Sequence, residues 1–134
     1  MIAYEQNIEW LEWANRILNV TFNARDCVWI SNIVNDKPIA VVVYSRFSPY
    51  NCEMSIATNG AKTWASRQFL RACYAYPFLQ MHLFRITAAV EEQNTASLKM
   101  LRQLGHVEEA RLSAWFGEQD AILFRMKKEE CKWI

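Results

Sequence analysis

A strand–helix–strand succession in the middle of the chain constrains the fold more than any other feature. Residues 52–58 (CEMSIAT) read as a strand, 62–75 as an amphipathic helix, and 84–91 (FRITAAVE) as a second strand. Such a unit is a crossover connection, which is right-handed and leaves its two strands parallel. The fold must therefore contain a parallel pair of strands with a helix packed across it.

The segments on either side of this unit indicate a mixed sheet. Helical or strand periodicity predicts a helix at 6–19, strands at 27–34 and 38–47, a helix at 94–104, and strands at 106–116 and 120–127. Asn7 is a candidate N-terminal cap, Gly105 a candidate C-terminal stop, and Asn35–Pro38 has the composition of a hairpin turn. We expect an α/β (α+β) fold, with a mixed, mostly antiparallel sheet and helices on both faces.

Composition adds limits to this expectation. The chain has 134 residues, 52% of them hydrophobic, with no linker or low-complexity stretch, so residues 1–134 are predicted to form a single domain. A net charge of +1 gives no basic field that would indicate nucleic acid, and no apolar stretch approaches the roughly 20 residues that span a bilayer.

The four cysteines are not spaced as metal ligands. None forms a CxxC pair and only two histidines accompany them, so we expect no metal site. Counting alone leaves two disulfides open. The N-terminus lacks the basic start and long apolar run of a signal peptide, so a reducing cytoplasm is the expected location.

Two strand-to-helix turns, at 58–64 and 91–95, are candidate ligand sites. Ligands of open α/β sheets bind beyond the carboxyl ends of parallel strands, and a helix N-terminus favours a phosphate. Lys62 and Arg67 could add positive charge at the first turn. An ordinary connecting loop has the same composition, so both interpretations stay open at this point.

The segment FRITAAVEEQNTASLKMLRQLGHVEEARL carries a more specific pattern. A strand ends in an acidic stretch, N-x-x-S follows at Asn94 and Ser97, and a helix ends in Leu-Gly at Gly105 before Glu109. This pattern resembles the second half of the GNAT fold, the GCN5-related N-acetyltransferases. The end of the chain, AILFRMKKEECKWI, resembles the last strand of short phage-encoded members. The resemblance runs from about Trp10 onward, and the family's first strand is expected to be missing or very short.

The resemblance implies that the parallel pair splays apart to hold acetyl-CoA. Its pantetheine arm would pair with the strand that ends at Thr58, and its pyrophosphate would rest on amides at the start of the next helix. The cofactor-binding residues that it implies are Ile56, Ala57, Thr58, Thr63, Trp64, Ala65, Asn94 and Ser97. The family usually has glycine where this chain has Thr63, and Trp64 is bulkier than a close backbone approach prefers.

The resemblance points to Glu53 as the catalytic base of the reaction. The sequence is equally consistent with Glu53 being an exposed strand residue without a catalytic role. Glu91 and Glu92 are further candidate bases that fit solvated turn residues better. Many family members have a tyrosine acid where this chain has Leu101. Its absence favours the branch that resembles ribosomal-protein N-terminal acetyltransferases.

Cys52 and His106 are interpreted as packed core residues rather than as catalytic groups. The predicted function is transfer of an acetyl group from acetyl-CoA to a primary amine, such as a protein N-terminus or a lysine. A catalytically weak or inert module that binds a host or phage protein is the alternative. The expected partners are acetyl-CoA and the amine acceptor, without nucleic acid or membrane, and the protein would be a monomer or homodimer.

Overall fold

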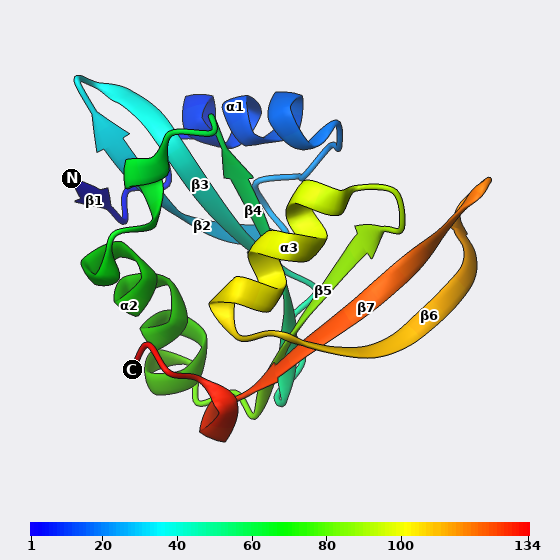
Figure 1. The fold of residues 1–134 in the computed structure, drawn as a ribbon. Coiled ribbons are helices and arrows are strands. Elements are labelled where there is room, and N and C mark those ends of the chain that lie inside the picture. The colour runs from blue at the N-terminus through cyan, green and yellow to red at the C-terminus, as the bar shows by residue number, and fades with distance from the viewer.

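The computed structural model describes residues 1–134 and arranges them around one seven-stranded sheet in the order β1-β2-β3-β4-β5-β7-β6 (Figure 1). The strands are β1 (Ile2–Ala3), β2 (Cys27–Val34), β3 (Lys37–Ser45), β4 (Asn51–Thr58), β5 (Arg85–Glu91), β6 (Val107–Phe116) and β7 (Gln119–Lys127). The α-helices are α1 (Ile8–Leu18), α2 (Arg67–Ala75) and α3 (Thr95–Leu104). Short helical turns lie at Lys62–Ala65, Tyr76–Gln80 and Lys128–Glu130.

The sheet is mostly antiparallel with one parallel pair, as the sequence predicts. β4 and β5 run parallel, while every other neighbouring pair is antiparallel. Asn35 and Asp36 both adopt the left-handed conformation, at φ 52° and 62°, which makes the tight turn expected between β2 and β3. The first strand is present but only two residues long.

Alternate residues of the central strands pack against helices on opposite faces. Val41 and Val43 of β3 contact Leu11 and Ala14 of α1 on one face. Their neighbours Ala40, Val42 and Tyr44 belong to the main core on the other face, together with Phe69, Leu70, Cys73 and Tyr74 of α2. α3 covers this second face over β5 and β7, where Leu98 and Leu101 pack with Ala88, Val90 and Phe124. Helices therefore cover both faces of the sheet.

The predicted cap of α1 at Asn7 and the predicted stop of α3 at Gly105 are confirmed, and Asn94, predicted as the first residue of its helix, is the N-terminal cap of α3. Asn7 accepts a hydrogen bond from the Glu9 N–H at the start of α1, and Asn94 accepts one from the Ser97 N–H at the start of α3. Gly105 ends α3 at φ 103°, a conformation that a side chain disfavours.

The predicted helix at 62–75 is wrong in its first turn. A 3₁₀ turn occupies Lys62–Ala65, Ser66 is extended at ψ 151°, and the α-helix begins only at Arg67. Ser66 causes this break because its hydroxyl accepts a hydrogen bond from the Phe69 N–H and caps α2.

The predicted strand at 38–47 is also too long. β3 ends at Ser45 because Arg46 leaves the extended region, at φ 51°. Pro77 lies just beyond α2, within the wider helical turn that follows it.

Candidate active site

The parallel pair at the centre of the sheet holds together over only three residues. Asn51, Cys52 and Glu53 of β4 pair with Arg85, Ile86 and Thr87 of β5. Beyond this point β4 stays with β3 as far as Thr58, and β5 stays with β7 as far as Glu91. The two strands therefore diverge, and each has N–H and C=O groups along the gap that no neighbouring strand pairs with.

A cavity of about 480 Å³ occupies this divergence. β4 contributes Met54, Ser55 and Ile56 to its wall, and β5 contributes Ala88, Ala89, Val90 and Glu91. Asn94, Ser97, Met100 and Leu101 of the α3 region close one side, and Leu18–Val20, Phe22 and Phe116 complete the lining. The cavity is therefore a largely apolar slot between two exposed backbone edges, with Glu91 as its one charged residue.

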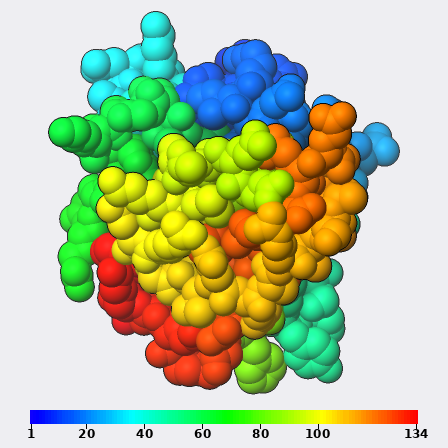
Figure 2. All heavy atoms as spheres, turned by 45° about the vertical axis from the view of Figure 1, so that its right-hand side comes forward, coloured from blue at the N-terminus to red at the C-terminus, as the bar shows by residue number.

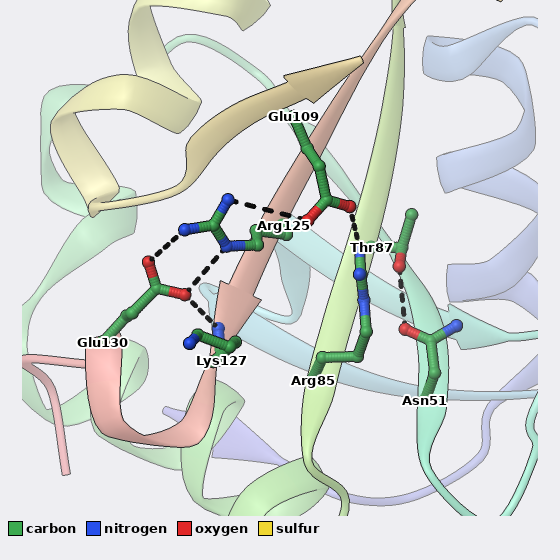
Figure 3. A network of polar contacts seen from close by, with 7 residues as sticks. All are labelled: Asn51, Arg85, Thr87, Glu109, Arg125, Lys127 and Glu130. Carbon is green, nitrogen blue, oxygen red and sulfur yellow. Dashed lines mark hydrogen bonds and ion pairs between the residues drawn. The ribbon is translucent and has the colours of Figure 1, made fainter.

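Polar contacts fasten the closed end of this cleft (Figure 3). The Thr87 hydroxyl donates to Asn51 Oδ1 over 2.7 Å, joining β5 to β4 where they are still paired. Beside it, Glu109 bridges Arg85 and Arg125, at 2.8 Å and 3.5 Å. Arg125 also pairs with Glu130 of the C-terminal turn. The end from which the strands diverge is thus tied to β6, β7 and the chain terminus.

A second polar cluster fixes the hairpin at the open end. Arg111 pairs with both Glu92 and Asp120, and Glu92 also accepts a hydrogen bond from the Asp120 N–H. Hydrogen bonds from the Ala114 N–H and from Arg111 lower the pKa of Asp120. Figure 2 shows the atoms of the hairpin (orange), the β5–α3 turn (yellow-green) and α1 (blue) meeting on one face of the molecule.

This cluster corrects one interpretation of the sequence. Glu92 is not a solvated turn residue, because it holds the hairpin to the end of β5. The carboxylate of Glu92 is occupied by its ion pair with Arg111, whereas the neighbouring Glu91 is exposed and lines the cleft.

The turn before α2 is built around Trp64. Its carbonyl accepts a hydrogen bond from Asn32 Nδ2 on β2, over 3.0 Å, and its indole packs against the main core with an edge-on contact to Phe69. Thr63 is exposed, so the outer side of the turn is not covered by the indole. The N–H groups of Arg67 and Gln68 have no acceptor within α2 and lie at the positive end of its dipole.

Glu53 lies at the apex of the divergence, on the face of the sheet that α1 covers. Its neighbours Cys52 and Met54 point into the core on the opposite face. Its Oε2 lies 2.8 Å from Nε of Arg46, and its side chain is 28% exposed. Glu53 therefore keeps access to solvent next to the cleft but is not part of the cavity wall.

The structure brings together only part of the predicted set. Ile56, Asn94 and Ser97 line the cavity, whereas Ala57 is buried beneath α1. The remaining predicted residues, Thr58, Thr63, Trp64, Ala65 and Glu53, lie outside the cavity wall. The loop after α1 and Phe116 of the hairpin line it without having been predicted, because they come from segments with no diagnostic local pattern.

Two polar residues assigned to the core are buried there. Burial raises the pKa of the Cys52 thiol to about 12 and lowers the pKa of His106 to about 4. His106 lies 2.7 Å from the Tyr74 hydroxyl and packs against its ring. All four cysteines are free, and no helix is long and apolar enough to cross a membrane.

Solved structures with the same architecture are acetyltransferases. A GNAT-family acetyltransferase from Bacillus anthracis superimposes with a TM-score of 0.68 at 18% identity, over 96% of this chain and 95% of that one. Mutant forms of the spermidine/spermine N-acetyltransferase SpeG from Vibrio cholerae give 0.67 at 18% identity, over 96% and 81%. The N-acetyltransferase PseH from Campylobacter jejuni gives 0.61 at 13% identity, over 90% and 79%.

No protein-family model and no curated protein matches the sequence. The structural matches show that the chain has the acyl-CoA N-acyltransferase fold of the GNAT acetyltransferases. The diverging β4–β5 pair, predicted from the resemblance, is confirmed as a feature of this fold.

Proposed function

We propose that the protein transfers an acetyl group from acetyl-CoA to a primary amine. The observation that carries this proposal is the divergence of β4 and β5 after three paired residues, which opens an apolar slot between two unpaired backbone edges. The amide-rich pantetheine arm of acetyl-CoA suits such a slot, because its amides can pair with the free N–H and C=O groups of β4. Ile56 to Thr58 supply this edge.

The two ends of the slot suit the remaining parts of acetyl-CoA. The pyrophosphate would rest on the turn of Thr63, Trp64 and Ala65, where the free N–H groups at the start of α2 favour an anion. The N-terminal turn of α3 supplies Asn94 and Ser97 to the wall near the reactive end. Because Asn94 Oδ1 is occupied in capping α3, its amide N–H groups are the part that would contact the cofactor arm.

The reaction assigns a task to Glu53. Its carboxylate takes one proton from the acceptor's ammonium group, directly or through water. The neutral nitrogen then attacks the thioester carbonyl carbon, the C–S bond breaks, and a second proton passes from nitrogen to the departing CoA thiolate, which leaves one N–H on the amide product. Backbone N–H groups of β4 polarise the carbonyl during the attack. Leu101 has no proton to donate to the thiolate, so this second proton comes from the attacking nitrogen, directly or through water.

The same proposal extends to the branch of the family and to the cellular setting of the protein. The N-x-x-S pattern and the lack of a tyrosine at Leu101 favour a relationship to the ribosomal-protein N-terminal acetyltransferases, with a protein N-terminus or a lysine as acceptor. The terminal pattern favours a phage-encoded protein that works in the host cytoplasm.

A thiol-release assay with acetyl-CoA and a broad panel of amines tests the activity. We expect acceptor-dependent release of CoA, and a strong loss of turnover in Glu53→Gln with acetyl-CoA affinity unchanged. Glu53→Gln with full turnover would remove Glu53 from the mechanism. Arg67→Gln is the companion variant, for which we expect weaker acetyl-CoA binding with little change in kcat.

One observation favours a second candidate, an inert module that keeps the fold and acts through protein contacts. The position of the family's usual acid is filled by Leu101, which is buried in the core beneath α3. Turnover with any amine in the panel excludes this candidate. Tight acetyl-CoA binding without turnover, together with a stable partner captured from host lysate, would support it.

A further inference from the structure

A second hollow adjoins the cleft on the side of Glu53. It encloses about 880 Å³ between the loop after α1 and the turn between β3 and β4. It shares Val20 and Phe22 with the cleft, so these two residues form a common wall. Apolar groups of Phe22, Val28 and Phe47 line the hollow beside three charged residues, Arg25, Asp26 and Arg46.

Arg46 connects this hollow to Glu53. It lines the hollow, and its Nε lies 2.8 Å from Glu53 Oε2. Its φ of 51° is unfavourable for a residue with a side chain, so the turn holds the arginine in place at some cost. Its side chain is 79% exposed despite the ion pair.

The ion pair uses one edge of the guanidinium only. The two terminal nitrogens of Arg46 have no partner in the chain, and they form the planar fork that binds a carboxylate through two parallel hydrogen bonds. A carboxylate bound there would lie one guanidinium width from Glu53. An amine attached close to that carboxylate would then reach Glu53 and the apex of the cleft.

The charges of the hollow discriminate between kinds of amine. Arg25 has no ion-pair partner and adds a second positive charge, whereas Asp26 is the one unpaired acid in the lining. A polyamine needs several carboxylates and would meet two arginines here, so this hollow disfavours it. A zwitterion with an apolar side chain meets cations, an acid and the rings of Phe22 and Phe47.

We propose, resting on the proposed acetyltransferase function, that this hollow is the acceptor site and that the acceptor is a free amino acid. Arg46 binds its carboxylate with the terminal nitrogens, Nε stays with Glu53, and the α-amine faces Glu53 for deprotonation. The amine nitrogen attacks the thioester carbon, CoA leaves as the thiol after taking the second nitrogen proton, and the product is an N-acetyl amino acid. At this site the Arg46 fork favours a free amino acid over the protein N-terminus or lysine that the N-x-x-S pattern favours, because a protein N-terminus has an amide in place of the carboxylate.

The test compares phenylalanine with phenylalaninamide, which keeps the amine and the side chain but lacks the carboxylate. With acetyl-CoA present, we expect kcat/KM for the acid to exceed that for the amide by about tenfold or more, because a charge-assisted fork is lost. Arg46→Gln should bring the two values within about twofold of each other, and Arg46→Lys should keep part of the preference. The readout is the ratio of kcat/KM for phenylalanine to kcat/KM for phenylalaninamide. A general loss of turnover lowers both values equally and leaves this ratio unchanged.

Arg16→Gln, on the exposed side of α1, is the matched control and should keep the preference. A calorimetric titration with phenylalanine alone reads the same site without turnover, and Arg46→Gln should weaken that binding about tenfold. Equal or better use of the amide, or a preference for spermidine, would overturn the amino-acid assignment while leaving the transferase proposal intact. Absence of acetyl-CoA binding and of turnover with every amine would instead defeat the transferase proposal.

Discussion

The buried pair of His106 and Tyr74 predicts a specific dependence of stability on pH. His106 is 4% exposed, its Nδ1 has no hydrogen-bond partner, and burial lowers its pKa from 6.5 to about 4. The imidazole is therefore neutral in the folded protein at neutral pH. Below pH 6.5 the imidazole of His106 binds a proton in the unfolded chain but stays neutral in the folded one. The contribution of His106 to the free energy of unfolding is therefore complete above pH 6.5 and is lost as the pH falls toward about 4.

The size of this effect follows from the two pKa values. Between about pH 7.5 and about pH 5, the linkage relation gives a loss of roughly 2 kcal/mol in the free energy of unfolding. His106→Phe removes the titrating group and leaves the Tyr74 hydroxyl unpaired, which costs about 1 kcal/mol at both pH values. The variant should therefore be less stable than the wild type at the higher pH but lose roughly 2 kcal/mol less on acidification.

Urea unfolding at both pH values measures this difference directly. The other histidine, His82, is exposed at φ 55°, so His82→Asn is the matched control, since asparagine tolerates that conformation. We expect the control to follow the wild type. Equal losses of stability on acidification in the wild type and in His106→Phe would refute the assignment of a buried neutral imidazole.

Three further predictions concern the cleft and its supports. Ser97→Trp should fill the slot and raise the Kd for acetyl-CoA by about tenfold or more, whereas Lys99→Trp on the exposed side of α3 should not, by calorimetry. Gly105→Ala should lower the free energy of unfolding by about 1–2 kcal/mol in urea, and Gly105→Asn by less, because of the φ of 103°. Thr87→Val should lose the hydrogen bond to Asn51 and about 1 kcal/mol of stability, and equal melting of variant and wild type would contradict it.

Local chemistry made much of the fold predictable. The turn at Asn35 and Asp36, the cap at Asn7 and the stop at Gly105 each depend on residues within a few positions of one another. The break before α2 was missed because Lys62–Ala65 contains no proline or glycine, and only the capping hydrogen bond of Ser66 reveals it.

The site was less predictable because distant segments build it. Asn32 fixes the carbonyl of Trp64 from 32 positions away, and Arg111 holds Glu92 from across the hairpin. No local pattern pairs such residues. The family resemblance located the slot through Asn94 and Ser97, but the loop after α1 and the fork of Arg46 emerge only once the chain is folded.

Binding of acetyl-CoA underlies every step proposed for the cleft, and calorimetric titration of the purified protein measures it. We expect saturable binding with one site per chain, competed by CoA, and weakened in Ser97→Trp but not in Lys99→Trp. No heat of binding at millimolar acetyl-CoA, from protein shown to be folded by its cooperative unfolding in urea, would contradict it.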